Sequence, residues 1–247
     1  MPDADYDAIA RRLSAATRVT ALTGAGVSAA SGVPTFRGTG GLWRAFRAED
    51  LATPHAFARD PALVWEWYDW RRGLIAACRP NRAHEVLAAW SHQRPGFSVV
   101  TQNVDGLHER VGTANLTRLH GSIWTLQCWA ACGASPWQDL RTPLDPRPPR
   151  CPGCGGLARP GVVWFGETLD PSNLAAADAA CTCDVLLVVG TSSIVYPAAG
   201  LTDVARSRGA WIVEINPEAT PTAADVYLRV PAEVALEELA NRTGIGT

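Results

Sequence analysis

The sequence predicts an α/β fold, a Rossmann-like doubly wound parallel sheet, together with a smaller domain made of a zinc ribbon and a helical module. Two observations carry this prediction. Short Val- and Ile-rich segments bounded by Gly, Asn or Pro alternate with helical patterns, as is typical of parallel strands buried on both faces. Two segments interrupt this alternation, and one of them contains four cysteines arranged in two pairs.

The chain opens with an amphipathic helical pattern whose acidic residues come first, which is not the pattern of a signal peptide. The buried strands are expected at Val19–Leu22, Phe97–Thr101, Val185–Val189, Trp211–Ile215 and Val226–Val230. Helices between them are expected at Ala83–His92, Ser172–Ala180 and Pro197–Arg208. A doubly wound sheet binds its ligands at the carboxyl ends of its strands, so the residues that follow these strands are candidates for a site.

The two interruptions predict how the chain divides into domains. The first carries a helix that starts at Asp60 and Pro61, a capping residue followed by a proline in the first helical position. The second is rich in Cys, Pro, Gly and Trp and has little helical pattern. We therefore expect residues 1–38, 81–123 and 161–247 to form the Rossmann-like domain. Residues 39–80 and 124–160 are expected to form the smaller one.

Composition limits the classes of function. The net charge is −2 and the pI about 6.2, which does not suggest nucleic acid as a partner. No apolar segment approaches the roughly 20 residues needed to span a membrane. Seven cysteines without an export signal favour a metal or buried thiols over disulfides. We expect a soluble bacterial protein of the cytoplasm, acting as a monomer.

The stretch from Gly24 to Gly38 follows the first expected strand and is rich in glycine and other small residues. Glycine lets a backbone pass close to a ligand, and a helix that opens next favours a phosphate. The spacing, Gly24-x-Gly26 with the next glycine at Gly32, departs from the G-x-G-x-x-G of dehydrogenases. A dinucleotide site and a plain tight turn both fit this stretch.

The cysteine pairs predict a structural zinc site. Cys128 and Cys132 have three residues between them, Cys151 and Cys154 have two, and eighteen residues separate the pairs. This spacing is within the range of zinc ribbons, and four thiolates would leave no open position on the metal. Buried or redox-reactive thiols are the alternative. The other three cysteines, Cys78, Cys181 and Cys183, are expected to be packing residues.

Polar residues follow the second strand. Gln102, Asn103 and Asp105 supply hydrogen-bond donors and acceptors suited to a carboxamide and a ribose. His120 stands in Leu-His-Gly just before the cysteine segment and is the natural general base, because a free imidazole titrates near neutrality. The alternative is that the Asn and Asp form turns and that the histidine is structural.

The motifs GAGVSAASGVPTFRG, TQNVDGLH, LHG, the cysteine pairs, VVWFGE, GTSSIVYPA and EINPE occur in the order found in sirtuins. The resemblance runs from about Arg18 to the C-terminus. It implies an enzyme that removes acyl groups from lysine by consuming NAD, giving nicotinamide, O-acyl-ADP-ribose and free lysine. The implied partners are acyl-lysine proteins or peptides, and one structural zinc ion is implied beside the NAD co-substrate.

The resemblance also assigns roles to residues. His120 would be the base that deprotonates the ribose hydroxyls, with Asn103 as a second catalytic residue. The backbone of Val163, Trp164, Phe165 and Gly166 would pair with the substrate peptide as an added strand. The implied NAD contacts are Gly24, Ala25, Gly26, Thr35, Phe36, Arg37, Gln102, Asn103, Asp105, Gly190, Thr191, Ser192, Asn216, Pro217, Glu218 and Ala232.

Tyr68 and Arg71 suggest which acyl group is removed. They are three residues apart and therefore on one face of the expected helix. A phenol and a guanidinium can together bind a carboxylate. This Tyr-x-x-Arg resembles the signature of class III sirtuins, the desuccinylase and demalonylase branch. That branch favours succinyl and malonyl groups, with acetyl as a weaker substrate. An amphipathic helix with Arg at its solvated edge is the alternative.

Other functions remain open at this stage. One is a deacetylase that prefers acetyl groups, and another is a protein ADP-ribosyltransferase that sends the activated ribose to a different acceptor. A third is a non-catalytic NAD-binding or zinc-ribbon interaction module. A base beside the ribose at His120 argues against the third, since binding alone does not need one.

Overall fold

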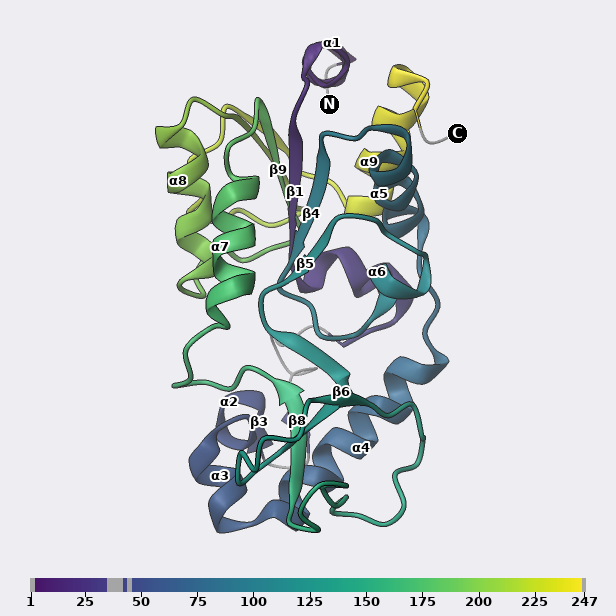
Figure 1. Ribbon diagram of the computed structural model, residues 1–247. Helices are drawn as coiled ribbons and strands as arrows, with labels where there is room; N and C mark the ends of the chain where they lie inside the picture. The colour runs from purple at the N-terminus through teal and green to yellow at the C-terminus, as the bar shows by residue number, and fades with distance from the viewer. Residues whose placement is uncertain (1–2, 35–41, 44–45, 246–247) are drawn as a thin grey trace.

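A computed structural model describes residues 3–34, 42–43 and 46–245 of the chain. Its centre is a six-stranded sheet with the order β11-β10-β9-β1-β4-β5, in which all pairs are parallel. Figure 1 shows its strands β9, β1, β4 and β5 side by side. The strands are β1 (Val19–Thr23), β4 (Phe97–Thr101), β5 (Leu116–Arg118), β9 (Val185–Val189), β10 (Trp211–Ile215) and β11 (Val226–Leu228). The chain builds outward from β1 on one side and then returns to β9 on the other. The strand order therefore reverses between β1 and β9, where a doubly wound sheet places its ligand crevice.

Helices cover both faces of this sheet. α1 (Asp3–Ala15), α5 (Arg82–Gln93) and α9 (Ala232–Thr243) pack on one face, while α7 (Pro171–Ala180) and α8 (Leu201–Ser207) pack on the other. Residues along one strand alternate between the two cores: Val185, Leu187 and Val189 join the first, and Leu186 and Val188 join the second. Every strand residue of β9 is buried, as the apolar pattern predicts.

The expected strands are confirmed to within two residues at their ends, and three differences stand out. β5 was not expected, because a three-residue strand with exposed Arg118 leaves no apolar pattern. The glycine-rich stretch opens a 3-10 helix, η1 (Ala25–Ser31), in place of an α-helix. The helix expected at Pro197–Arg208 begins as the 3-10 turn η3 (Ala198–Gly200) and continues as α8.

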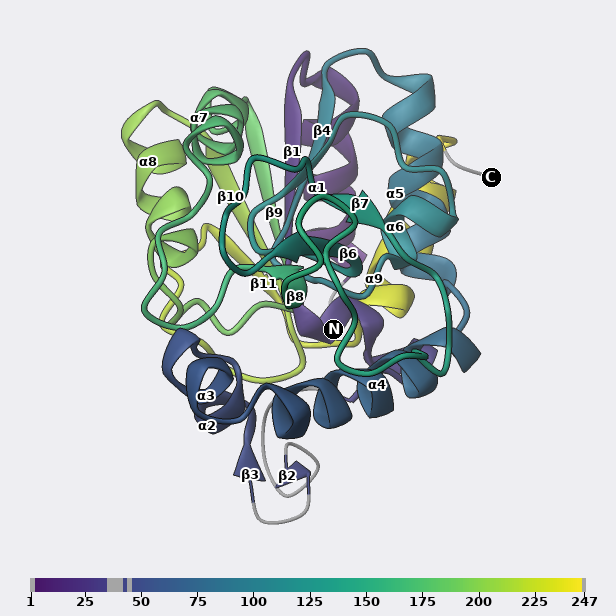
Figure 2. The same cartoon turned by 60° about the horizontal axis from the view of Figure 1, so that its bottom comes forward.

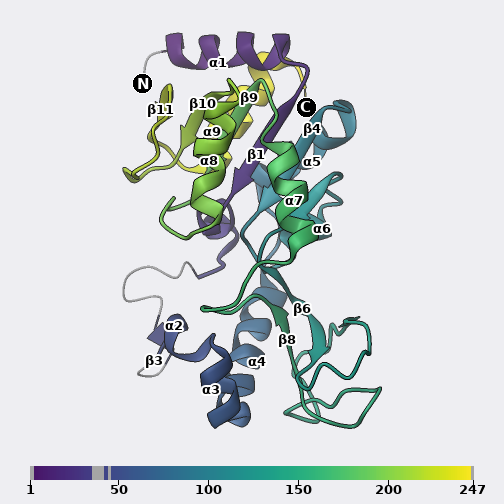
Figure 3. The ribbon, with the colours of Figure 1, turned by 60° about the vertical axis from the view of Figure 1, so that its left-hand side comes forward.

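Two further groups of elements form what we call the small module, residues 48–77 and 121–162. It holds α2 (Ala48–Leu51), α3 (Pro54–Arg59) and α4 (Pro61–Ala77). It also holds an antiparallel sheet of β6 (Gly121–Cys128), β7 (Trp137–Gln138) and β8 (Ala158–Val162) in the order β7-β6-β8. A two-stranded pair, β2 (Leu42–Trp43) with β3 (Phe46–Arg47), precedes α2. Figure 3 shows this module at one end of the parallel sheet and α1 across the other.

α4 is the helix predicted to start at Asp60 and Pro61. The Asp60 carboxylate accepts a hydrogen bond from the Leu63 backbone N–H at 2.9 Å, which confirms the cap. The helix runs beside α2 and α3 (Figure 2). Its buried face carries Trp65, Trp67 and Tyr68 into a core shared with β6 and β8.

Two charged residues of α4 hold the loop after β6. Arg72 is fully buried and donates to the carbonyl oxygens of Ile123, Asp139 and Arg141 at 2.6–3.0 Å. Asp69 accepts hydrogen bonds from the Leu144 N–H at 2.8 Å and from Arg147 at 2.6 Å. These bonds fix the segment between the cysteine pairs, which has little regular structure, against a rigid helix.

Among the described residues, no helix is both long enough and apolar enough to cross a bilayer.

Candidate active site

Three glycines bring the loops after β1 and β9 into direct contact at the point where the strand order reverses. The Gly24 N–H donates to the Val189 carbonyl oxygen at 3.0 Å, and the Gly26 N–H donates to that of Gly190 at 2.7 Å. A Cβ on Gly26 would lie 2.6 Å from the Gly190 Cα, and one on Gly190 would lie 2.5 Å from the Val27 nitrogen. The sequence predicts that glycine lets the backbone pass close to a ligand here. The structure shows that these glycines also let the two loops pack directly against each other.

Gln102 joins the strand ends. It follows β4, and its backbone N–H donates to the Thr23 carbonyl oxygen at the end of β1 at 3.0 Å. Its side-chain Nε2 donates to Thr191 Oγ1 after β9 at 2.8 Å. Its carbonyl oxygen lies 2.9 Å from His120 Nδ1. One residue thus fixes three neighbouring loops relative to one imidazole.

The protonation state of His120 follows from this contact. A carbonyl oxygen can only accept, so Nδ1 carries the hydrogen and Nε2 presents a lone pair. Among the described residues, none bonds to Nε2. Burial lowers the pKa of His120, while the bond to Gln102 acts to raise it. The neutral, proton-accepting form therefore predominates at neutral pH, as a general base requires.

The side chains of Asn103 and Asp105 bind the loop after β1. Asn103 Nδ2 donates to the Gly24 carbonyl oxygen and to Ser28 Oγ, both at 3.1 Å. Ser28 Oγ donates to Asp105 Oδ2 at 2.8 Å. Asp105 Oδ1 accepts the Leu107 N–H at 2.8 Å. Both carboxylate oxygens of Asp105 thus accept hydrogen bonds from within the chain. The side-chain oxygen of Asn103, Oδ1, can accept a hydrogen bond from a ligand.

No pattern in the sequence predicted the layer of side chains behind these residues. His84 Nδ1 lies 3.3 Å from the Asn81 N–H, so its hydrogen is on Nε2, which lies 3.3 Å from Ser28 Oγ. His108 packs against it with ring centroids 4.9 Å apart. Burial lowers the pKa of His84 to about 4 and that of His108 to about 3. Both imidazoles are therefore neutral supports at physiological pH.

Six of the implied NAD contacts follow β9 and β10, namely Gly190, Thr191, Ser192, Asn216, Pro217 and Glu218. Asn216 Nδ2 donates to the Thr191 carbonyl oxygen at 2.8 Å, and Asn216 Oδ1 accepts the Glu218 N–H at 3.1 Å. Pro217 and Glu218 are exposed, and Ser192 is half-buried. Ala232 is 3% exposed in the core beneath α9, so its backbone at the helix start is the part that could meet a ligand.

The segment Val163 to Gly166 leaves β8 beside His120. The Val163 N–H donates to the His120 carbonyl oxygen and the Phe165 N–H to that of Ala52, both at 2.9 Å. The Trp164 N–H donates to Glu167 Oε2 at 2.8 Å. Three of the four amide donors are therefore used inside the chain. The Val163 and Phe165 carbonyls and the Gly166 N–H are the groups with which a peptide could pair.

Tyr68 and Arg71 share one face of α4, as their spacing predicts. The Tyr68 hydroxyl accepts a hydrogen bond from Trp164 Nε1 at 2.9 Å, and burial raises the pKa of Tyr68 to about 12. The Arg71 guanidinium lies 4.9 Å from the Trp67 ring centroid and 5.9 Å from that of Tyr68. Burial lowers the pKa of Arg71, and Tyr68 and Asp105 act to raise it. Arg71 is half-buried and Arg72 is fully buried, so neither is a freely solvated side chain.

The four cysteines converge at the far end of the small module. All four Sγ atoms lie within 4.8 Å of one another, with Cys128 and Cys154 at 3.6 Å and Cys132 and Cys151 at 3.7 Å. Tetrahedral Zn–S bonds of about 2.3 Å place sulfurs roughly 3.8 Å apart, so the donor set fits zinc. Cys181 and Cys183 are buried in the sheet core, as expected of packing residues, and Cys78 is partly exposed.

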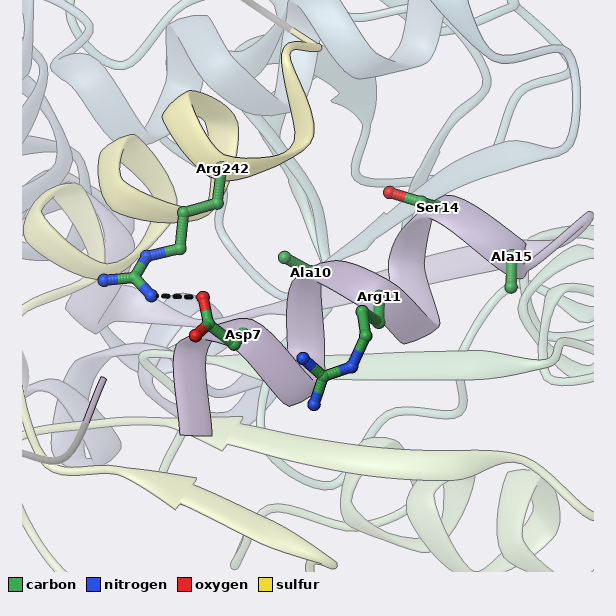
Figure 4. A pocket seen from close by; sticks show the side chains of 6 residues that line it. All are labelled: Asp7, Ala10, Arg11, Ser14, Ala15 and Arg242. Atoms are coloured by element: carbon green, nitrogen blue, oxygen red, sulfur yellow. Dashed lines mark hydrogen bonds and ion pairs between the residues drawn. The ribbon is translucent and has the colours of Figure 1, made fainter. Parts of the chain in front are cut away.

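Thr35, Phe36 and Arg37, expected to contact NAD, lie outside the described residues. A separate hollow of about 580 Å³ lies between α1 and α9, lined by Asp7, Ala10, Arg11, Ser14, Ala15 and Arg242 (Figure 4). It contains none of the candidate residues and lies away from the carboxyl ends of the strands (Figure 3). We therefore place the site at the strand ends.

The predicted residues form one connected path. On one side, Tyr68 is hydrogen-bonded to Trp164, whose chain neighbour Val163 is hydrogen-bonded to His120. On the other side, hydrogen bonds lead from His120 to Gln102, then to Thr191 and Asn216. The strand ends at the reversal point are where a doubly wound α/β protein binds a nucleotide. The Val163–Gly166 backbone beside His120 has groups suited to pairing with a peptide.

The comparisons agree with this class. The Sir2 family model matches residues 24–197, and the chain belongs to that family. A relative from Aquifex aeolicus (strain VF5), named NAD-dependent protein deacylase, is 50% identical over 224 residues, covering 90% of this chain and 93% of the relative.

Solved structures show the same fold. A Sir2 homologue in complex with NAD has a TM-score of 0.91 at 43% identity, covering 96% of this chain and 93% of that one. A Sir2 complex with a p53 peptide and NAD⁺ has a TM-score of 0.85 at 26% identity, covering 96% and 98%.

Proposed function

We propose that this chain is an NAD-dependent protein-lysine deacylase that transfers an acyl group from lysine to ADP-ribose. Its products would be nicotinamide, O-acyl-ADP-ribose and free lysine. Membership of the Sir2 family and the names of its relatives support this activity. The observation that carries it is the bond from His120 Nδ1 to the Gln102 carbonyl, which leaves Nε2 as a base at the strand ends.

The chemistry begins when the acyl carbonyl oxygen attacks the ribose carbon that bears nicotinamide. Nicotinamide leaves with the bonding electron pair, and an alkylimidate forms on the ribose. His120 Nε2 then takes a proton from the ribose hydroxyls, so that a hydroxyl oxygen can attack the imidate carbon. Water completes the release of lysine. The side-chain carbonyl of Asn103 is suited to orient the reacting ribose or a water molecule.

The acylated peptide would lie along Val163–Gly166. The carbonyl and N–H groups still available there are backbone groups, so recognition depends little on the peptide's sequence. At the start of this segment, the Val163 N–H donates a hydrogen bond to the His120 carbonyl oxygen. This bond fixes the position of the segment relative to the proposed base. The acyl-lysine would extend from this segment toward the base.

We further propose that the preferred acyl groups are succinyl and malonyl, with acetyl a weaker substrate. Tyr68 and Arg71 support this preference, because a neutral phenol and a cationic guanidinium on one helix face suit a carboxylate. Each hydrogen bond to a charged partner contributes about 1.5–3 kcal/mol. An acetyl group cannot make these bonds. The four-cysteine cluster would hold one structural zinc ion away from the reacting atoms.

Two variants test the activity and the preference separately. His120→Ala should lower formation of O-acyl-ADP-ribose by about 10²–10⁴-fold, the usual contribution of a general base, as measured by mass spectrometry. Arg71→Met should lower the ratio of desuccinylation to deacetylation about 10-fold or more, corresponding to at least 1.4 kcal/mol. Full product formation by His120→Ala would refute the mechanism. An unchanged ratio in Arg71→Met would refute the acyl preference alone.

A further inference from the structure

Trp164 connects the peptide segment to the acyl-binding pair. Its backbone lies in the segment proposed to bind peptide, and its indole ring reaches α4 in the small module. The indole Nε1 donates to the Tyr68 hydroxyl oxygen at 2.9 Å. We infer that Trp164 is a specificity-positioning residue, which fixes the Tyr68 hydroxyl as a donor toward a carboxylate on the acyl group. This inference rests on the proposed acyl preference.

The hydrogen bond between Trp164 and Tyr68 can have only one direction. An indole N–H can only donate, so the Tyr68 oxygen accepts and its own hydrogen is not used in this bond. Within the described chain, Trp164 is the hydrogen-bond partner of the Tyr68 hydroxyl. The hydroxyl hydrogen must then point away from Trp164. A carboxylate, which only accepts, is the ligand that such a donor suits, and Arg71 stands one turn further along the same helix.

The indole is held firmly enough to set this direction. Trp164 is 2% exposed, and the Arg159 guanidinium lies 3.5 Å from its ring centroid. Phe57 packs against the ring at 5.3 Å between centroids. Arg159 also pairs with Glu167 at 2.5 and 2.8 Å, and Glu167 Oε2 accepts the Trp164 backbone N–H. Backbone and ring of Trp164 are therefore fixed by the same ion pair.

Trp164→Phe tests the inference because it keeps an aromatic ring for Arg159 and Phe57 and removes the N–H. We expect the ratio of desuccinylation to deacetylation, as kcat/KM, to fall about 5- to 10-fold, with most of the change in KM for the succinyl peptide. Tyr68→Phe should lower the ratio by a similar factor. The double variant should match Tyr68→Phe alone, since the two side chains act through one hydroxyl.

Trp129→Phe is the matched control. Trp129 packs on Phe57 at 4.9 Å and on Trp164 at 6.2 Å, so it tests loss of an indole in the same core without loss of the bond to Tyr68. It should leave the ratio unchanged. An unchanged ratio in Trp164→Phe, with a lowered ratio in Arg71→Met, would overturn the inference and leave the acyl preference standing. Equal losses for both acyl groups, or additive effects in the double variant, would also overturn it.

Discussion

At the scale of single residues, the hydrogen-bond partner of His120 determines its chemistry. The Gln102 carbonyl assigns the hydrogen to Nδ1, and burial lowers the pKa of the ring. Both effects keep Nε2 able to accept a proton. A histidine in the same place without this carbonyl could hold its hydrogen on either nitrogen.

The lowered pKa of His120 predicts the pH dependence of the reaction. The base works in its neutral form, so kcat/KM should be flat at neutral pH and fall as the pH drops through the pKa of the free enzyme. Because burial lowers that pKa from its ordinary 6.5, the acid midpoint should lie below pH 6.5. A kcat/KM profile with an acetylated peptide, which adds no titrating carboxylate, measures this. A midpoint above 6.5 would contradict the burial argument.

That His120 is the base stays a prediction from the sequence, and so do the ligand contacts of Asn103 and Asp105. The structure shows the Gln102 carbonyl beside the His120 ring. The sequence could not predict the Ser28, His84 and His108 layer, although Ser28 stands within the glycine-rich motif. Nothing in the local pattern around His84 marks it, because its role depends on how α5 packs against η1. Such contacts arise from tertiary packing between segments far apart in the chain.

At the scale of elements, α4 carries the proposed acyl-binding pair, Tyr68 and Arg71, and also holds the small module together. Its start was predicted from Asp60 and Pro61. The amphipathic pattern places charged residues outside, so the burial of Arg72 could not be read from it. The residue is kept inside by three backbone carbonyls, that of Ile123 in β6 and those of Asp139 and Arg141 in the segment that follows β6.

Arg72→Met should therefore destabilise the protein strongly. The substitution leaves the Ile123, Asp139 and Arg141 carbonyls without their donor, and we expect a loss of about 3–5 kcal/mol in the free energy of unfolding. Urea unfolding at neutral pH measures it. Arg118→Met is the control, since Arg118 is 45% exposed and pairs with Glu109 at 3.4 Å, which predicts under about 1 kcal/mol. Equal effects of the two substitutions would show that the buried bonds matter no more than the surface pair.

At the scale of the whole molecule, the chain combines a parallel sheet with a smaller module at its end (Figure 1). The proposed base, His120, lies between β5 and β6, while the proposed acyl pair and the four cysteines lie in the module. The alternation of strands and helices predicted the doubly wound parallel sheet but not the order of its strands. The domain boundaries stay a prediction. The smaller domain was expected over 124–160, whereas β6 begins at Gly121, three residues earlier, and β8 ends at Val162, two residues later.

Metal removal should affect the stability of the molecule more than its chemistry. The purified protein should contain one zinc ion per chain, and a strong chelator should lower the thermal midpoint by roughly 10 °C, since a loss of about 3 kcal/mol shifts a chain of this size by that amount. Elemental analysis and calorimetry measure the two effects. Cys151→Ser should lose the metal, while Cys78→Ser, whose thiol lies outside the cluster, should keep it. Metal-free protein with an unchanged midpoint would contradict the zinc assignment.

The meeting of Gly24, Gly26 and Gly190 has a thermodynamic consequence for substrate capture. Folding already orders the loops after β1 and β9, because their backbones are in direct contact. These contacts leave no space for a side chain between the two loops. A dinucleotide that settles there does not have to immobilise these loops itself, so less of its binding energy is lost to ordering the protein.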